Sequence, residues 1–232
     1  MILTYSNQKG GVGKSTLATL YANHLAAEDE AKGIEGKPVV FIEADLQQSI
    51  TAQRKTDIEN WGEDAARYDV KFISPKTFEE SEEIMRGLRQ LIERYPEMTI
   101  IIDVPGNITD DYLAPIFVYS DYIICPYSYQ DIVLHSTSTF IRVIERLRQI
   151  YSTMKAELVF IPNRVDKRIG LEGEKRKFMQ CDALFETKGL VTPKVYNRAD
   201  LTRFTTVFNT PKQEAETEKC FAFLDNLLNL NK

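Results

Sequence analysis

Two hydrophobic patterns alternate along the chain and predict an α/β protein. Short runs that are mostly apolar, as at 2–6, 39–44 and 98–106, are typical of strands buried on both faces. Between them, apolar residues recur at helical spacing, as in the segment that begins at Ser15 and in 78–93. Further strands are expected at 69–74, 121–128, 156–165 and 191–197, and further helices at 132–151 and 211–231.

This alternation predicts a parallel sheet with helices on both of its faces. We therefore expect a three-layer, doubly wound, mostly parallel α/β fold in a single domain over residues 1–232. Ligands of such sheets bind beyond the carboxyl ends of the strands. Three polar features follow predicted strands there, namely a glycine-rich loop, Asp45 and Asp103.

Composition narrows the class of protein. The 232 residues are 43% hydrophobic, which is enough for a sizeable core, and the net charge of −5 argues against a constitutive nucleic-acid binder. Cys125, Cys181 and Cys220 lie far apart without CxxC spacing, so neither a disulfide framework nor a metal site is indicated. The sequence shows no signal-peptide pattern and no apolar run of about 20 residues. We expect a soluble, cytoplasmic protein without a membrane partner.

The segment 7–16, NQKGGVGKST, predicts a phosphate-binding loop. It fits the pattern G-x-x-x-x-G-K-[ST] except that Gln8 stands at the first glycine. Glycines let successive N–H groups point at an anion, and the helix that follows adds its N-terminal dipole. Lys14 can reach the β- and γ-phosphates, while the Ser15 hydroxyl can coordinate Mg²⁺. The expected phosphate-binding residues are Gly10, Gly11, Val12, Gly13, Lys14, Ser15 and Thr16.

A second lysine, Lys9, precedes these glycines, and with it the loop resembles the deviant Walker A motif of the ParA/MinD family of P-loop ATPases. In that family the early lysine reaches the phosphates held by the partner subunit of a nucleotide-sandwiched dimer. The resemblance implies an ATP-dependent homodimer in which Lys9 completes the partner's site. It covers nearly the whole chain and is strongest over 2–20, 39–49, 98–106 and 157–166.

Two carboxylates follow the same resemblance. VVFIEADLQQS at 39–49 resembles the family's switch I, in which Asp45 matches the aspartate that orients the attacking water. Glu43 replaces an aspartate of that motif and Leu46 replaces a proline, which puts the rate and geometry of hydrolysis in question. MTIIIDVPG resembles a Walker B strand and places Asp103 beside Mg²⁺. The resemblance implies ATP and Mg²⁺ as cofactors, Lys9, Lys14 and Asp45 as catalytic residues, and Ser15, Asp45 and Asp103 as the metal site.

The stretch VFIPNRVD at 159–166 resembles the family's base-recognition segment. Asn163 offers an amide donor and an acceptor, which match one edge of adenine, and Arg164 could stack on the ring or pair locally. Guanine-specific P-loop proteins carry an Asn-Lys-x-Asp stretch, whereas this chain has Arg at the lysine position. The sequence therefore favours ATP.

The resemblance is closest to a short ParA-type partition ATPase, because the chain begins almost directly at the phosphate loop. It implies an ATP hydrolase that acts in segregation or maintenance of a plasmid, chromosome or mobile element, with hydrolysis stimulated by a ParB-like or other activator. Non-specific DNA is a candidate partner, although a solvated charged face explains the basic residues equally well. Those residues are Lys167, Arg168, Lys175, Arg176, Lys177, Lys194, Arg198 and Arg203.

Three alternatives stay open at this point. A MinD-like membrane-cycling ATPase is disfavoured, because the tail has few basic residues and an internal packed helix explains it better. A related reductase or small-molecule ligase would need a cysteine-held cluster or a substrate pocket that the sequence does not reveal. A slow nucleotide-switch scaffold with little hydrolysis would fit the changes at Glu43 and Leu46.

Overall fold

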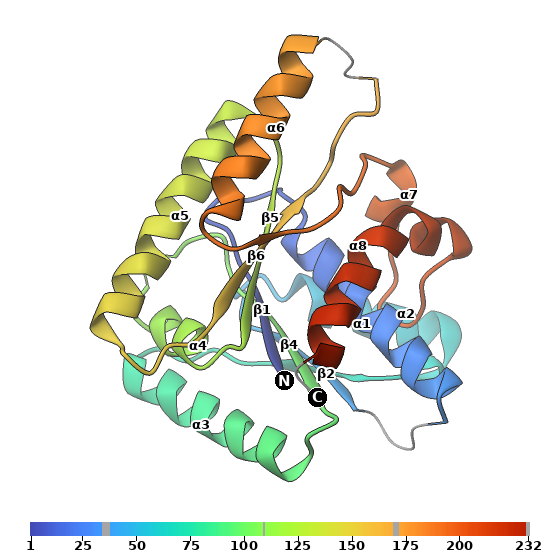
Figure 1. Ribbon diagram of the computed structural model, residues 1–232. Coiled ribbons are helices and arrows are strands. Elements are labelled where there is room, and N and C mark those ends of the chain that lie inside the picture. Colours follow the sequence, from blue (N-terminus) through green and yellow to red (C-terminus); the bar gives the residue numbers. More distant parts are fainter. Residues whose placement is uncertain (34–37, 109, 169–171, 231–232) are drawn as a thin grey trace.

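A parallel sheet forms the centre of the molecule, as the computed structural model shows (Figure 1). The structure describes residues 1–33, 38–108, 110–168 and 172–230. Within them, the sheet has seven strands in the order β3-β2-β4-β1-β5-β6-β7, and every pairing is parallel. The expected doubly wound α/β fold is confirmed. The strands are β1 (Ile2–Tyr5), β2 (Val39–Glu43), β3 (Asp69–Phe72), β4 (Thr99–Asp103), β5 (Tyr122–Tyr127), β6 (Glu157–Pro162) and β7 (Leu190–Val191).

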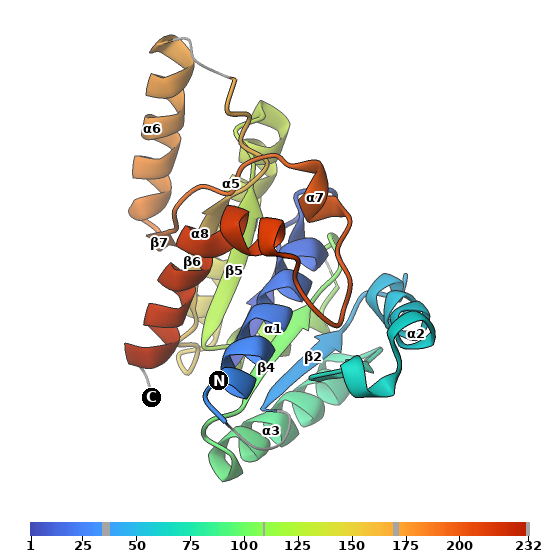
Figure 2. The ribbon, with the colours of Figure 1, turned by 90° about the vertical axis from the view of Figure 1, so that its right-hand side faces the viewer.

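Helices cover both faces of the sheet and bury a separate apolar cluster on each (Figures 1 and 2). One cluster joins the sheet to α3–α6 through side chains such as Met85, Phe140 and Phe185. The other joins it to α1, α2, α7 and α8 through side chains such as Tyr21 and Phe221. The helices are α1 (Lys14–Ala31), α2 (Ser49–Trp61), α3 (Phe78–Arg94), α4 (Leu113–Val118), α5 (Asp131–Ile150), α6 (Glu172–Glu186), α7 (Ala199–Thr202) and α8 (Pro211–Leu230).

Most of the predicted elements are confirmed, but the last strand is much shorter than expected. A strand was predicted over 191–197, whereas β7 covers only Leu190–Val191. Pro193 has no N–H to continue the ladder, so beyond it only an isolated bridge joins Val165 to Tyr196. Four helices, α2, α4, α6 and α7, were not expected from the apolar pattern.

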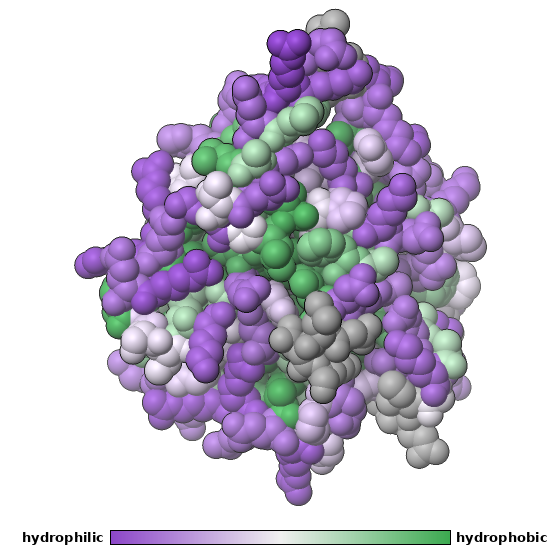
Figure 3. Space-filling model, viewed as in Figure 1, coloured by the Kyte–Doolittle hydropathy of each residue, from purple (hydrophilic) through white to green (hydrophobic). Residues whose placement is uncertain are grey.

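The closing helix α8 packs on the sheet as the sequence predicts. Its side chains Cys220, Phe221, Leu224 and Leu228 are buried in the same cluster as α1. The predicted helix extended to residue 231, which lies outside the described residues. Among the described helices, none is both long and apolar enough to cross a bilayer. The face seen in Figure 3 is mostly polar, with apolar side chains gathered near its centre.

Helix α2 links the switch-like segment after β2 to the stretch that precedes α8. Near its middle, Asp57 Oδ2 accepts hydrogen bonds from Thr206, 2.6 Å from the backbone N and 2.7 Å from Oγ1. At its end, Trp61 meets Phe208 edge to face with ring centroids 5.0 Å apart. These contacts fix α2 against the C-terminal part of the chain.

Candidate nucleotide site

The glycine-rich loop joins the carboxyl end of β1 to the N-terminus of α1, as the motif requires. Gly11 and Gly13 have φ of +76° and +94°, a region that glycine enters without strain. At Gly13 a side chain would also lack space, because a Cβ would lie 2.3 Å from Nδ2 of Asn163. Glycines in this conformation at the start of a helix let a loop turn its amides toward a bound phosphate.

Asn7 holds this loop from beneath and was not singled out from the sequence. Its side chain is fully buried, and Nδ2 donates to Pro126 O at 2.8 Å and to Thr137 Oγ1 at 3.0 Å. Its Oδ1 accepts from the backbone N of Lys9 at 3.1 Å. Asn7 thus ties the loop to β5 and α5. The available signal was an amide side chain directly between a buried strand and the glycines.

Lys14 and Gly106 lie together at the base of the site. The Lys14 side chain is buried, and a Cβ placed on Gly106 would lie 3.6 Å from its Nζ and 3.5 Å from the backbone N of Gly10. Gly106, which follows β4, therefore approaches the phosphate loop closely.

Asp103 ends β4 as a buried carboxylate whose charge the protein does not fully compensate. The pKa of Asp103 is raised to about 7, mainly by burial and also by the charges of Glu43 and Asp45, while the Ser15 hydrogen bond and the Lys14 charge offset part of the rise. Its Oδ1 is buried and has no hydrogen-bond partner among the described residues. An orphaned anionic oxygen beside a serine hydroxyl fits the inner or outer shell of a Mg²⁺ ion. The residues predicted for the metal site therefore suit that ion.

Glu43 stands opposite Asp103 in the register of β2 and β4, yet its carboxylate binds the start of α2. Oε1 accepts from the backbone N of Ile50 at 2.9 Å, and Oε2 accepts from the backbone N and Oγ1 of Thr51 at 2.8 and 2.6 Å. The side chain is fully buried. Glu43 thus caps a helix that has no side-chain cap of its own and compensates its positive N-terminal end.

Asp45 lies between these two carboxylates and α2, in a tight turn. It is half-buried, its Oδ1 accepts from the backbone N of Gln47 at 3.0 Å, and its charge acts on Asp103. Gln48 follows with a left-handed φ of +50° and leads into α2. Leu46, at the tip of the turn, is 63% exposed. The turn places the Asp45 carboxylate where its charge acts on Asp103, and its role in orienting water stays a prediction.

Lys9 lies on the other side of the loop, half-buried on the wall of an open groove of about 700 Å³. Gly10, Gly11 and Val12 line the same groove, which extends to Tyr129 and to residues of α6. The two lysines of the motif therefore lie in different surroundings. Lys14 faces Gly106 at the base of the site, while Lys9 borders a surface that a second molecule could approach.

Asn163 and Arg164, predicted for the base, follow β6 next to the loop. Asn163 is buried and its Nδ2 donates to Val12 O at 2.8 Å, whereas Arg164 is exposed with a left-handed φ of +56°. A pocket beside them is lined also by Thr16, Tyr196 and Asn197, but it holds only about 20 Å³. That is room for about one water molecule, so a base would have to open it. The stretch 196–198 was not assigned from the sequence, because it meets β6 only in the fold.

Comparison with known proteins agrees with this geometry. The sequence profile of the CobQ/CobB/MinD/ParA nucleotide binding domain matches residues 3–201. The chain belongs to this family. The range matched to the CobQ/CobB/MinD/ParA domain contains the glycine loop and Asp103. No curated protein matches the chain significantly in sequence.

Several solved structures share the fold over almost the whole chain. Apo McdA from Cyanothece has a TM-score of 0.70 at 17% identity and covers 98% of each chain. A putative plasmid partition protein from Borrelia burgdorferi, bound to AMPPNP, has a TM-score of 0.68 at 22% identity, covering 97% of this chain and 98% of its own. Cobyrinic acid a,c-diamide synthase from Mycobacterium smegmatis, with an ATP analogue and magnesium, has a TM-score of 0.66 at 16% identity and covers 98% and 93%. These likenesses establish the fold, and the family includes proteins of different activities.

Proposed function

We propose that this protein is an ATP-dependent dimerising ATPase of the ParA type, active in segregation or maintenance of a plasmid, chromosome or mobile element. The observation that carries the proposal is the separation of the two lysines. Lys14 is buried at the base of the phosphate loop, and Lys9 borders an open groove on its outer side. A cation placed there can reach the phosphates of a nucleotide held by a second copy, so that hydrolysis depends on dimerisation.

Each residue of the site has a defined part in this reaction. The loop amides and Lys14 bind and orient the triphosphate, and Asp45 orients the attacking water from the turn after β2. Ser15 and Asp103 would hold Mg²⁺, which supplies positive charge against the phosphates when bound. Asn163 keeps the loop in shape through Val12 and stays our candidate, with Arg164, for contact with the adenine ring. Hydrolysis removes the γ-phosphate that both subunits share, and the dimer separates.

The decisive experiment compares Lys9→Ala with the unchanged protein. We expect nearly unchanged binding of a fluorescent ATP analogue, because Lys14 and the loop amides remain. We expect ATP-dependent dimerisation, measured by light scattering, and ATP turnover to be lost. Lys55→Ala, which removes an exposed lysine on α2, is the matched control and should behave as the parent. A Lys9→Ala protein that still dimerises with ATP would refute the trans assignment.

Non-specific DNA is a proposed partner that the surface charges favour only weakly. Six of the eight basic residues named from the sequence form ion pairs on the surface, so their field is largely compensated locally. The pairs are Lys167–Glu216, Arg168–Asp166, Lys175–Glu172, Lys177–Asp131, Lys194–Asp182 and Arg198–Glu216. Exposed pairs of this kind are weak, and DNA phosphates can compete for them.

A DNA titration with ATP, with ADP and without nucleotide tests this partner at two salt concentrations. ATP-dependent binding that is indifferent to sequence and falls steeply with salt would support it. Binding that does not respond to ATP would remove DNA from the proposal and leave the ATPase unaffected. A ParB-like or other activator is then identified as the protein that raises ATP turnover of the dimer.

Two other functions are weighed against specific observations. A MinD-like membrane cycle needs a tail free to bind lipid, but the apolar side chains of α8 are buried against the sheet. A slow nucleotide switch is favoured by Glu43, which is engaged at α2. Turnover per site measured with and without dimerisation separates the switch from the ATPase. A cytoplasmic location belongs to the proposal and agrees with the free thiols of Cys125, Cys181 and Cys220.

A further inference from the structure

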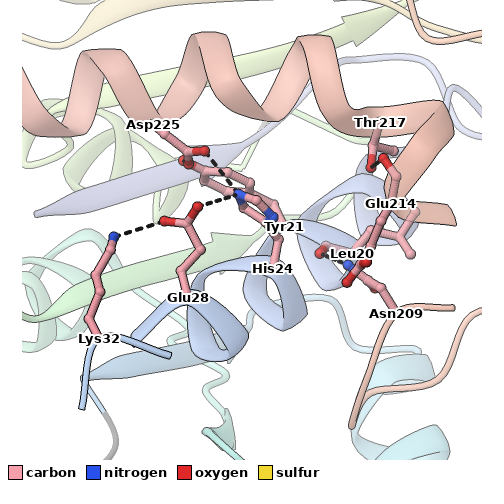
Figure 4. Close-up of polar contacts among 9 residues, drawn as sticks. All are labelled: Leu20, Tyr21, His24, Glu28, Lys32, Asn209, Glu214, Thr217 and Asp225. Carbon is pink, nitrogen blue, oxygen red and sulfur yellow. Dashed lines mark hydrogen bonds and ion pairs between the residues drawn. The ribbon is translucent and has the colours of Figure 1, made fainter. Parts of the chain in front are cut away.

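His24, Glu28 and Asp225 converge in a groove between α1 and α8, apart from every residue assigned to the nucleotide (Figure 4). The groove has a volume of about 570 Å³ and is lined by both helices. His24 and Glu28 are one turn apart on α1, so their side chains share a face, and Asp225 reaches them from α8. All three side chains are partly buried, with access from the groove.

The distances among the three donor atoms suit a single small cation. His24 Nε2 lies 2.9 Å from Asp225 Oδ2 and 3.7 Å from Glu28 Oε1, and all three donor atoms lie within 4.8 Å of one another. Ligands of a tetrahedral zinc ion with bonds of about 2.1 Å stand about 3.4 Å apart. The observed separations bracket this value, so small rotations of the side chains would complete the geometry.

Neighbouring groups hold each of the three side chains in this arrangement. Tyr21 OH donates to the other oxygen of Asp225, Oδ1, at 2.9 Å, and Lys32 Nζ donates to the other oxygen of Glu28, Oε2, at 2.9 Å. The imidazole of His24 packs against the rings of Tyr21 and Phe221, at centroid distances of 5.9 and 5.3 Å. Each carboxylate therefore has one oxygen held from outside while its second oxygen faces Nε2. Such outer contacts orient the ligands of metal sites.

We propose that His24, Glu28 and Asp225 bind one divalent transition-metal ion of the zinc type. One imidazole nitrogen and two carboxylate oxygens are donors that zinc accepts, and the groove leaves a fourth position for water. The bound ion would join α8 to α1, the helix that begins at the phosphate loop. The metal would thereby hold the C-terminal helix α8 against the helix that follows the phosphate loop.

The field at this position is negative, as a cation site requires. Burial lowers the pKa of His24, but the hydrogen bond and charge of Asp225 and the charges of Glu28 and Glu214 raise it overall. A simple ion pair between His24 and Asp225 would also lie in such a field. The two descriptions differ in a measurable way, because a hydrogen bond or ion pair to Asp225 needs a proton on residue 24, whereas a metal needs the imidazole lone pair.

The test is a zinc titration of the full chain by calorimetry, after removal of metals with a chelator. Excess Mg²⁺ and ADP occupy the phosphate loop, and a Cys181→Ser background removes the half-buried thiol. We expect one zinc ion per chain. Replacement by Co²⁺ should give a visible absorption band of a coordinated ion, and zinc should raise the melting temperature by several degrees.

His24→Gln is the informative variant, because its amide can still donate to Asp225 while it is a poor metal ligand. We expect zinc affinity to fall at least about tenfold, with folding preserved. Glu28→Gln should weaken binding in the same direction. His135→Gln is the matched control, because His135 is the other histidine of the chain and is exposed on α5. The absence of zinc binding in the parent, or equal affinities of the parent and H24Q, would overturn the proposal.

Discussion

Glu43 and Thr51 are joined by two hydrogen bonds to one carboxylate oxygen. Oε2 of Glu43, at the end of β2, lies 2.8 Å from the backbone N and 2.6 Å from Oγ1 of Thr51, in the first turn of α2. The extra methylene that distinguishes Glu43 from aspartate is what lets a strand residue reach the helix. The departure from the family's switch I motif is therefore a structural contact in this protein.

Replacement of Glu43 by glutamine should destabilise the fold by about 1–3 kcal/mol. One amide oxygen would remain as acceptor, but the NH₂ group would face the donors of α2 and leave a buried group unpaired. Relief of repulsion with Asp103 offsets part of this loss. The free energy of unfolding in urea measures the effect, and Glu59→Gln, exposed on the same helix, should change it by no more than about 0.5 kcal/mol.

Glu43→Asp tests whether the length of the side chain matters separately from its negative charge. It keeps the carboxylate but withdraws it from Thr51, so we expect a loss of stability similar to that of Glu43→Gln. A Glu43→Asp protein as stable as the parent would show that the contact with α2 contributes little.

Gly13→Ala should impair both the loop and nucleotide binding. The left-handed φ of +94° would strain an alanine by about 1–3 kcal/mol, and its Cβ would displace Asn163 from Val12 O. Binding of a fluorescent ATP analogue should weaken at least tenfold. Retention of the parent's affinity would mean that the loop can rearrange without Asn163.

Gly87→Ala should act in the opposite sense and serves as the comparison. Gly87 is exposed within α3, has no neighbouring atom within 4 Å of an added Cβ, and lacks a positive φ. Alanine restricts the unfolded chain more than glycine does, so unfolding should cost about 0.5–1 kcal/mol more. Thermal unfolding monitored by circular dichroism should show a higher melting temperature for Gly87→Ala than for the parent, and a lower one would contradict the prediction.

Asp103→Asn should abolish the effect of Mg²⁺ on ATP binding without lowering the stability of the fold. Asp103 is a buried carboxylate near Glu43 and Asp45, and its Oδ1 has no hydrogen-bond partner among the described residues, so removal of its charge should leave the nucleotide-free protein as stable as the parent or more so. The gain in ATP affinity that Mg²⁺ brings should be lost. Affinities measured with Mg²⁺ and with a chelator test this, and a D103N protein with the parent's Mg²⁺ dependence would remove Asp103 from the metal site.

The sheet and the phosphate loop were predictable because their signals are local. Strands of the centre are mostly apolar, and the loop keeps its glycines and Lys14 within one short segment. Helix α2 escaped prediction for a physical reason. Its buried positions Ile50, Arg54 and Asp57 have helical spacing, but two of the three are charged. The buried positions of α2 therefore recur with the spacing of a helix, but they do not form the apolar stripe by which a helix is recognised in a sequence.

The contacts that the sequence did not reveal join separate segments of the chain. Arg54 becomes a core residue only because its guanidinium covers the Tyr68 ring at 4.3 Å and its Nη2 donates to Tyr68 O. Asn163 meets Val12, 151 positions away in the chain, and Asn7 meets Thr137, 130 positions away. Helix α6 buries only Phe185 along its length and so shows no apolar face to read.

Helix α2 also provides an intrinsic fluorescence probe of the nucleotide site. Its 13 residues form a rod of about 20 Å, held at one end by Glu43 beside the nucleotide site and carrying Trp61 at the other. Trp61 is the single tryptophan of the chain, and the edge-to-face contact with Phe208 sets its surroundings. A shift of α2 where the phosphates bind would alter the contact between Trp61 and Phe208, so the indole fluorescence should report on the nucleotide without any added label.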